Sequence, residues 1–168
     1  EMLLAENLDS ISVSFLVDEM TRHRGGVAPN IAYTLALLGE RPILVGTAGM
    51  DFDVYKAALE EVGVDTSGTR IYEDLYTASF FVSTDSQQAQ IAMFYTGAMA
   101  RSRDLSLAEA VEGTPDLVVI SPNDPVAMRN LIAECKERGI PYMYDPSQQV
   151  ARVTGEELAE GVDGAYIL

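Results

Sequence analysis

Apolar stretches of strand length alternate with helical stretches through the second half of the sequence. Residues 116–121 and 141–145 are predicted strands, and the stretch between them, residues 125–139, has a helical pattern that ends at a glycine. A short helix is predicted over residues 154–161. Apolar strands separated by helices indicate a mostly parallel sheet covered on both faces. The sequence therefore predicts an α/β fold.

The first half of the sequence shows the same alternation, together with an additional β element. The expected elements are helices at residues 28–38 and 53–63 and short strands at residues 42–47, 69–72, 77–84 and 89–95. A polar turn separates the last two strands, which makes them a candidate hairpin outside the alternation. A two-residue period also predicts a half-buried strand over residues 11–17. We therefore expect a small β unit attached to the α/β body.

Composition limits the classes of partner and compartment. The chain has 168 residues, and a hydrophobic share of 48% suits one globular domain with a core. Its formal net charge of -15 repels nucleic acid and anionic membranes, so neither is an expected partner. No apolar stretch approaches the roughly 20 residues of a membrane helix. Cys135 is the only cysteine and cannot form an intrachain disulfide, so we expect a reducing, cytoplasmic setting.

Several common catalytic motifs are absent. The sequence has no GxGxxG after a strand, no P-loop, no HExxH and no GxSxG. His23 is the only histidine and lies in a polar loop, so we expect a solvated residue and not a catalytic base.

We expect the chain to be truncated at both ends, because it opens at Glu1 without a methionine and its last apolar stretch stops at Leu168.

A diglycine turn before the first predicted helix is the most informative motif. Gly25 and Gly26 lack side chains, so their backbone N–H groups can approach a ligand closely. Asn30 follows in the first helical turn, and its amide offers a donor and an acceptor to two neighbouring sugar hydroxyls. Taken alone, the same residues also fit a plain loop with Asn30 as a local capping residue.

The wider spacing around this turn resembles the first signature of the ribokinase-like (PfkB) family of carbohydrate and nucleoside kinases. The positions that carry the resemblance are Gly25, Gly26, Ala28, Asn30, Ala32, Gly39 and Gly49. The later stretches FYTGAMARSRDLS, DLVVISPNDPVAM and YDPSQQVARV are similar to bacterial and archaeal adenosine or nucleoside kinases. The resemblance covers nearly the whole chain.

The resemblance implies a doubly wound, mostly parallel α/β domain with a small β-sheet lid. The lid would come from residues near 8–18 and 76–96, and in the family it often pairs with another subunit's lid, which implies a possible homodimer.

The implied reaction is ATP-dependent phosphorylation of a nucleoside hydroxyl, with adenosine as the expected substrate and Mg²⁺, with or without a monovalent cation, as cofactor. The alternatives are a sugar or sugar-phosphate kinase and a non-catalytic binding module. The family's general base and metal-linked motif lie outside this chain, so no catalytic residue is named.

By the same resemblance, Gly25, Gly26 and Asn30 are the expected substrate-binding residues. Asn123 and Asp145 follow predicted strands, at the end where α/β sheets bind ligands, although Asp145 also fits a turn before a proline. The aromatic side chains that could stack on a base are Phe15, Phe94 and Tyr95, and for each of them packing of the lid or a dimer contact is an alternative.

Charged residues near the predicted helices have structural explanations. We expect Asp124 or Pro125 to start the helix that follows, and Asp51 to be the N-cap of the helix over residues 53–63. Arg101 and Arg103 could attract phosphate, but a solvated helix start beside acidic neighbours explains them equally well. Thr154 and Glu157 form a capping-box pattern; these two residues should start the last helix.

Overall fold

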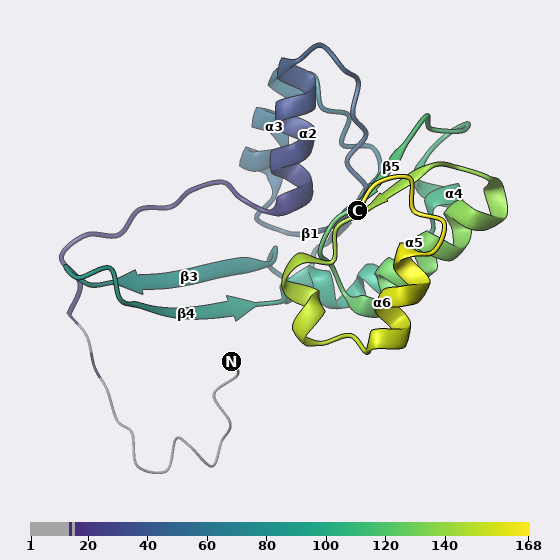
Figure 1. Ribbon diagram of the computed structural model, residues 1–168. Coiled ribbons are helices and arrows are strands. Elements are labelled where there is room, and N and C mark those ends of the chain that lie inside the picture. Colours follow the sequence, from purple (N-terminus) through teal and green to yellow (C-terminus); the bar gives the residue numbers. More distant parts are fainter. Residues whose placement is uncertain (1–13, 15) are drawn as a thin grey trace.

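The computed structural model describes residue 14 and residues 16–168, and Figure 1 shows how its elements are arranged. The strand predicted over residues 11–17 falls mostly outside the described residues. Its described members, Ser14, Leu16 and Val17, are exposed and belong to no strand, because no described strand pairs with them. The prediction is therefore wrong at these three positions.

Two pairs of parallel strands form the body. Strand β1 (Gly46–Gly49) pairs with β2 (Thr69–Tyr72), and the connection between them contains helix α3 (Asp53–Glu61). Strand β5 (Val118–Ile120) pairs in the same sense with β6 (Tyr142–Tyr144), again through a helical connection. Parallel pairing through helical crossovers confirms the predicted α/β fold.

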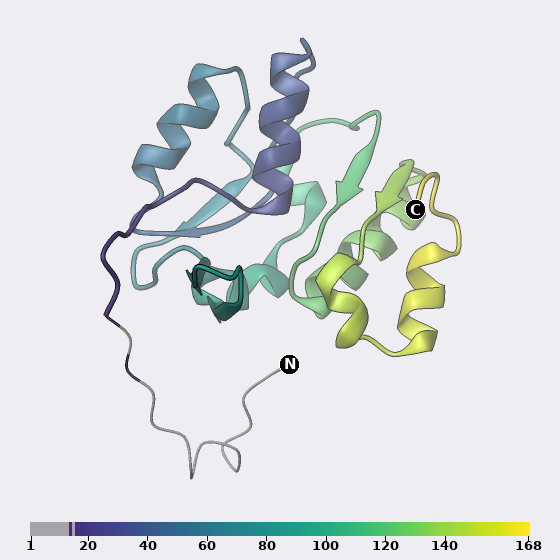
Figure 2. The same cartoon turned by 60° about the vertical axis from the view of Figure 1, so that its left-hand side comes forward.

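The helices gather on different sides of the body, as Figures 1 and 2 show. Helices α2 (Val27–Leu37) and α3 lie together, whereas α5 (Pro125–Arg138) and α6 (Gly155–Val162) lie on the side of β5 and β6.

One buried apolar cluster consists of Ala32, Leu44, Ala48, Phe52, Leu59 and Val64. The second consists of Leu107, Val111, Ile120, Met128, Ile132, Cys135, Ile140, Tyr142 and Tyr144. The described residues also form three shorter helical segments: η1 (Gly97–Asp104), α4 (Leu107–Ala110) and η2 (Ser147–Ala151).

Helix α5 begins and ends where the sequence predicts. Asp124 is its N-cap and accepts hydrogen bonds from the N–H groups of Val126 and Ala127, and Pro125 occupies the first helical position. Gly139 ends the helix with φ 66°, a left-handed conformation that glycine adopts without a steric penalty. The capping box of α6 is also present. Local sequence signals are therefore sufficient to place both helices.

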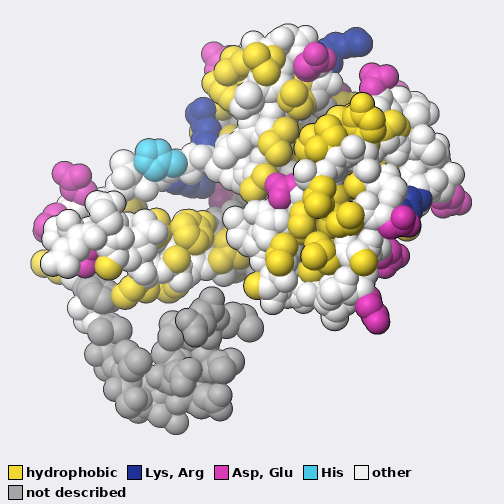
Figure 3. Space-filling view, viewed as in Figure 1, with side chains coloured by type: hydrophobic (Ala, Val, Ile, Leu, Met, Phe, Trp, Pro, Cys, Tyr) yellow, Lys and Arg dark blue, Asp and Glu magenta, His cyan; other side chains and the backbone are white. Residues whose placement is uncertain are grey.

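Strands β3 (Ser79–Thr84) and β4 (Gln90–Tyr95) form an antiparallel hairpin that projects from the body (Figure 1). At its tip, the carboxylate of Asp85 accepts hydrogen bonds from the N–H groups of Gln87 and Ala89, at 2.8 and 2.9 Å. The predicted hairpin and its polar turn are confirmed. Apolar side chains of the hairpin and of the region around the C-terminus remain visible on the surface in Figure 3.

The strand predicted over residues 42–47 is displaced along the chain, since the regular ladder of β1 covers Gly46–Gly49. The preceding apolar residues form only one isolated bridge, between Ile43 and Asp65. Pro42 cannot donate a ladder hydrogen bond, although its carbonyl accepts one from Asp65. Apolar character thus identified the approximate location of the strand but not its hydrogen-bonded limits.

Among the described residues, no helix is both long and apolar enough to cross a membrane.

Candidate functional site

The diglycine turn lies directly at the start of α2. Gly26 is the N-cap residue, with φ 98° and ψ 137°, a backbone conformation that residues other than glycine rarely adopt. No side chain caps this helix start. Pro29 has no N–H, so the described N–H groups of this first turn that lack a side-chain cap are those of Val27 and Ala28, and the helix dipole favours a polar or anionic group beside them.

Asn30 lies in the first turn of α2, and the residue is exposed. Its backbone N–H donates to the carbonyl of Gly26 at 3.0 Å, and its own carbonyl accepts from the hydroxyl of Thr34 at 2.9 Å. The interpretation of Asn30 as a capping residue is wrong, because Gly26 occupies the N-cap position and no side chain caps the helix. Contact with a sugar through its side-chain amide stays a prediction.

Asp51 has a different function from the one predicted. The N-cap of α3 is Phe52, again without a side-chain cap, so the expectation that Asp51 caps this helix is wrong. Instead, the Oδ1 atom of Asp51 accepts a hydrogen bond from the N–H of Thr77 at 2.8 Å. Burial acts to raise the pKa of Asp51, but hydrogen bonds from Thr77 and the charge of Arg22 outweigh it and lower the pKa below its usual value.

Tyr55 contacts the diglycine turn, and the sequence contains no signal for this contact. Its hydroxyl donates to the carbonyl of Gly25 at 3.0 Å, from the first turn of α3. The two residues are 30 positions apart, and neither local spacing nor periodicity connects them. Only the packing of α3 beside α2 brings them together.

Asn123 and Asp145 lie at the same edge of a sheet, after β5 and β6. Because these strands are parallel, with Ile120 opposite Tyr144, their carboxyl ends coincide. The Oδ1 atom of Asn123 accepts from the hydroxyl of Ser102 at 2.7 Å and from the N–H of Asp124 at 2.8 Å, which fixes the side chain. This part of the Asn123 amide therefore has a structural function.

Asp145 is partly buried beside an apolar cavity. Its N–H donates to the carbonyl of Ile120 at 3.0 Å. The cavity, of about 560 Å³, is lined mainly by side chains of β6, η2 and α6 and by Leu168. No hydrogen bond in the described part of the chain connects Asn123 or Asp145 with the diglycine turn.

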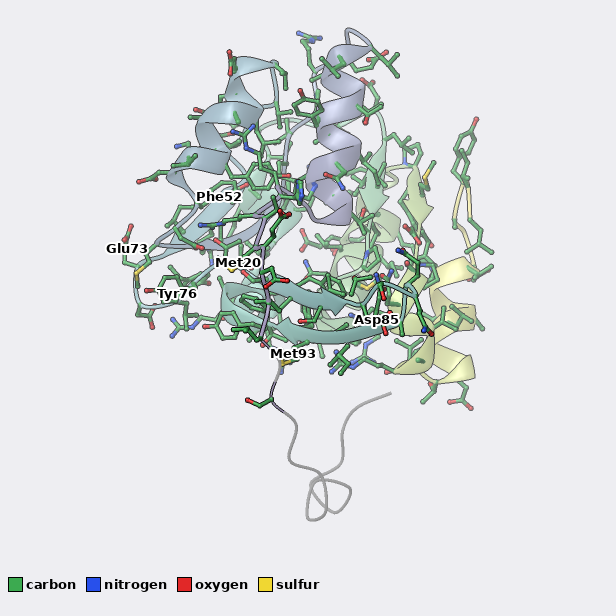
Figure 4. The ribbon with its side chains drawn as sticks, turned by 90° about the vertical axis from the view of Figure 1, so that its left-hand side faces the viewer. Met20, Phe52, Glu73, Tyr76, Asp85 and Met93 are labelled. Atoms are coloured by element: carbon green, nitrogen blue, oxygen red, sulfur yellow. The ribbon has the colours of Figure 1, made fainter. Side chains whose placement is uncertain are left out.

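Phe94 and Tyr95 point to opposite faces of the hairpin, because successive side chains of a strand alternate. Phe94 lies opposite Phe80 and is 54% exposed. Met93, labelled in Figure 4, pairs with Phe81 and shares its face with Tyr95, whereas Phe94 lies on the other face with Phe80. Phe15 lies outside the described residues.

The arginines of η1 form ion pairs that the sequence did not predict. Arg101 contacts Asp74 at 2.7 Å and lies over the ring of Tyr72, 4.9 Å from its centroid. Arg103 contacts Asp124 at 2.7 Å. Both arginines are exposed, as expected for solvated residues, but they lie in the last turn of η1 and their acidic partners lie on other segments. His23 is exposed in its loop, as expected.

The described residues contain no group of three or more His, Cys, Asp or Glu side chains close enough to hold a metal ion. Magnesium is usually held by one or two carboxylates together with substrate phosphates, so this finding concerns only a site built wholly from protein side chains. No residue of this part of the chain is assigned as a Mg²⁺ ligand.

Nucleoside kinases are among the similar proteins. A nucleoside kinase from Methanothermobacter thermautotrophicus is 28% identical over 159 residues, which cover 94% of this chain and 52% of that protein. The structure of Burkholderia thailandensis nucleoside kinase in complex with inosine has a TM-score of 0.82 and 32% identity, over 91% of this chain and 51% of that one. The chain spans about half the length of these proteins.

A more distant structure shows the shared fold. The Methanocaldococcus jannaschii nucleoside kinase, an archaeal member of the ribokinase family, has a TM-score of 0.81 at 22% identity, over 93% of this chain and 52% of that one. In sequence, residues 4–167 match the family described as pfkB family carbohydrate kinase. Because this match runs over nearly the whole chain, the protein belongs to the pfkB family of carbohydrate kinases.

Proposed function

We propose that the whole protein transfers the γ-phosphate of ATP to a hydroxyl group of a nucleoside. The observation that carries this proposal is the start of α2, where the N-cap Gly26 supplies no side-chain cap and Asn30 is exposed in the first helical turn. Neighbouring hydroxyls of a ribose need both donors and acceptors, and an amide side chain beside free N–H groups supplies both. A carboxylate or an ammonium group would supply only one kind.

A nucleoside is proposed over a free sugar for two reasons. Sequence identity of 32% links the chain with a Burkholderia kinase whose structure contains inosine. In addition, Phe94 presents an exposed ring on the hairpin, and an aromatic ring can stack on a nucleobase. We propose adenosine as the first substrate to test, with inosine beside it.

ATP is the proposed phosphate donor, with Mg²⁺ as its counter-ion, in the cytoplasm. A bound nucleotide would supply the transferable phosphate, and the residues described above would bind and orient the acceptor hydroxyl. The phosphate contacts are proposed to come from the part of the protein that this chain does not span. Arg101 and Arg103 are not assigned to phosphate, because both are engaged in ion pairs.

The hairpin is proposed to act as a lid. Its face with Phe80 and Phe94 would cover the nucleoside and exclude water, so that phosphate passes to the sugar hydroxyl. Its other face, with Phe81 57% and Met93 61% exposed, is also apolar, and we propose that it packs against the hairpin of a second subunit. Sedimentation of the whole protein would measure this association.

A substrate panel tests the proposed reaction. ADP formation would be measured with adenosine, inosine, ribose and fructose phosphates as acceptors, for the whole protein. Asn30→Ala should raise the KM for the nucleoside by about tenfold, since losing one hydrogen bond to a bound hydroxyl costs on the order of 1.4 kcal/mol. Asn130→Ala is the matched control, because Asn130 is an exposed amide on α5 that donates only to the carbonyl of Arg103.

Each result of the panel favours a different function. Turnover with nucleosides supports the proposal, whereas turnover with sugars or sugar phosphates alone would make the protein a sugar kinase. Nucleoside binding without any ADP formation would identify a binding module. An Asn30→Ala variant with an unchanged nucleoside KM would remove Asn30 from the site.

A further inference from the structure

The turn between β1 and α3 fixes the start of the hairpin. Besides the bond from Thr77 to Asp51, the N–H of Gly49 donates to the hydroxyl of Thr77 at 2.9 Å. The N–H of Met50 donates to the carbonyl of Leu75 at 2.9 Å. Three hydrogen bonds thus attach the segment that leads into β3 to one short turn of the body.

The same place is closely packed around two glycines. A Cβ atom at Gly49 would lie 2.3 Å from the carbonyl oxygen of Leu75, and one at Gly97 would lie 2.2 Å from that of Tyr76. The N–H of Ala98, just after β4, donates to this carbonyl of Tyr76 at 2.9 Å. Both ends of the hairpin are therefore anchored at one point, which we call the hairpin root (residues 75–77 and 97–98).

The opposite side of the β1–α3 turn contacts the segment around the diglycine turn. Arg22 reaches the Oδ2 atom of Asp51 at 3.4 Å, while Oδ1 of the same carboxylate accepts from the hairpin root. One helical turn later, Tyr55 donates to the carbonyl of Gly25. Burial raises the pKa of Tyr55, the nearby Arg24 lowers it, and the net shift is upward, so the phenol stays protonated as a donor at neutral pH.

We infer that Asp51 and Tyr55 are positioning residues that couple the hairpin root to the diglycine turn. The inference rests on the proposed function, in which the turn binds the nucleoside and the hairpin closes over it. Movement of the hairpin at its root would then be transmitted to the binding loop through Asp51, in the turn before α3, and Tyr55, in the first turn of that helix. Neither residue is proposed to touch the substrate.

Tyr55→Phe in the whole protein is the decisive variant. It removes one hydroxyl and retains the ring, which packs edge-to-face on Phe52 with the centroids 5.8 Å apart. We expect the nucleoside KM to rise by about three- to tenfold, the range that corresponds to one lost hydrogen bond. The KM for ATP and kcat should change less than twofold. Asp51→Asn, which removes the charge facing Arg22, should raise the nucleoside KM in the same way.

Tyr142→Phe is the matched control for a merely structural effect. Tyr142 also donates from its hydroxyl to backbone carbonyls, those of Gly161 and Asp163, but it lies in the core beside α6. This variant should lower Tm without changing the nucleoside KM. A parallel rise of both Michaelis constants in Tyr55→Phe, or an unchanged nucleoside KM, would overturn the inference.

Hydrogen exchange separates this inference from the proposed function. If the wild-type protein phosphorylated no nucleoside, the proposed function would fail, but the coupling could still be measured without substrate. Tyr55→Phe should then accelerate exchange of the Thr77 and Gly49 amides, which bond at the hairpin root. Faster exchange confined to the loop at residues 24–27 would show that the two segments are independent, and the inference would be wrong.

Discussion

The cluster around α5 and the β3/β4 hairpin both contain large apolar side chains, but they differ in burial. In the α5 cluster the exposed fraction never exceeds 7%. In the hairpin, Phe80, Phe81, Met93 and Phe94 are between 54% and 64% exposed. The cluster lies between a helix and a parallel strand pair, whereas each face of the hairpin lacks a covering layer among the described residues. Apolar content alone therefore does not identify the part of a chain that stabilises it.

This difference teaches where stability and function are located. A two-stranded hairpin is marginally stable by itself, so its order depends on its root and on whatever covers its faces. The α5 cluster gains its stability from side chains that are already buried. Substitutions in the cluster should therefore change global unfolding, while substitutions in the hairpin should change local opening and ligand binding.

The largest expected effect is that of Ile132→Ala. Ile132 is 3% exposed in the α5 cluster, and removing its buried methyl and methylene groups leaves a cavity. The free energy of unfolding should fall by about 2–5 kcal/mol. Urea denaturation of the chain, followed by far-UV circular dichroism, would measure the change.

Phe81→Ala is the comparison for Ile132→Ala. It removes a larger side chain, but Phe81 is 57% exposed, so the free energy of unfolding should change by no more than about 0.5 kcal/mol. Equal losses from the two variants would show that the hairpin face is covered in solution, and the contrast between the two regions would disappear.

A second comparison concerns the hairpin root, through Gly49→Ala and Gly46→Ala. Both glycines lie in β1, but a Cβ atom at Gly49 would collide with the backbone of residues 75–77, whereas one at Gly46 has no atom within 4 Å. Gly49→Ala should cost about 1–3 kcal/mol, because the backbone must move to accept the methyl group. Gly46→Ala should be neutral or slightly stabilising, and thermal unfolding of both variants would decide.

Most of the fold could be predicted because its signals are local. The N-cap Asp124, Pro125 and Gly139 lie within or next to the helix that they delimit, and the polar turn around Asp85 lies between the two strands that it joins. The displaced start of β1 shows the limit. Its ladder runs through GTAG, a small-residue stretch without apolar periodicity, and only pairing with β2 defines it.

The candidate site was predicted only in part, for the same reason. Gly26 and Asn30 belong to one contiguous motif, and the structure places both at the start of α2 as expected. Asp51 and Tyr55 have partners 26 and 30 residues away, and no spacing rule connects them. An aspartate just before a helix favours a capping interpretation, and only tertiary contacts show that it serves another segment.

The third prediction concerns Asp124 and has a pH dependence. Burial raises its pKa, but hydrogen bonds from Arg103, Ala127 and Val126 outweigh this and lower the pKa below the usual value. The carboxylate therefore stabilises the fold above its unfolded pKa of about 3.9, and this contribution is lost as the pH falls through the folded value. Asp124→Ala should cost about 1 kcal/mol at pH 7 and less at pH 3.

Asp124→Asn separates the cap from the charge. Asparagine caps helices about as well as aspartate and does not titrate, so this variant should keep most of the stability at both pH values. Urea denaturation at pH 7 and pH 3 would compare the three proteins. An Asp124→Ala loss that did not depend on pH would show that the ionised carboxylate is not the stabilising form.

The smallest expected effect is in the hairpin itself, at the cross-strand pair of Phe80 and Phe94. Directly opposite aromatic residues on one face contribute roughly 0.2–1 kcal/mol beyond their separate effects. A double-mutant cycle with Phe80→Ala and Phe94→Ala, read from hydrogen exchange of the β3 and β4 amides, should give a coupling in this range. Phe80→Ala with Met93→Ala is the control and should be additive, because those two side chains lie on opposite faces. If both cycles gave the same coupling, the two faces would not be independent, and a partner or ligand could not act on one face alone.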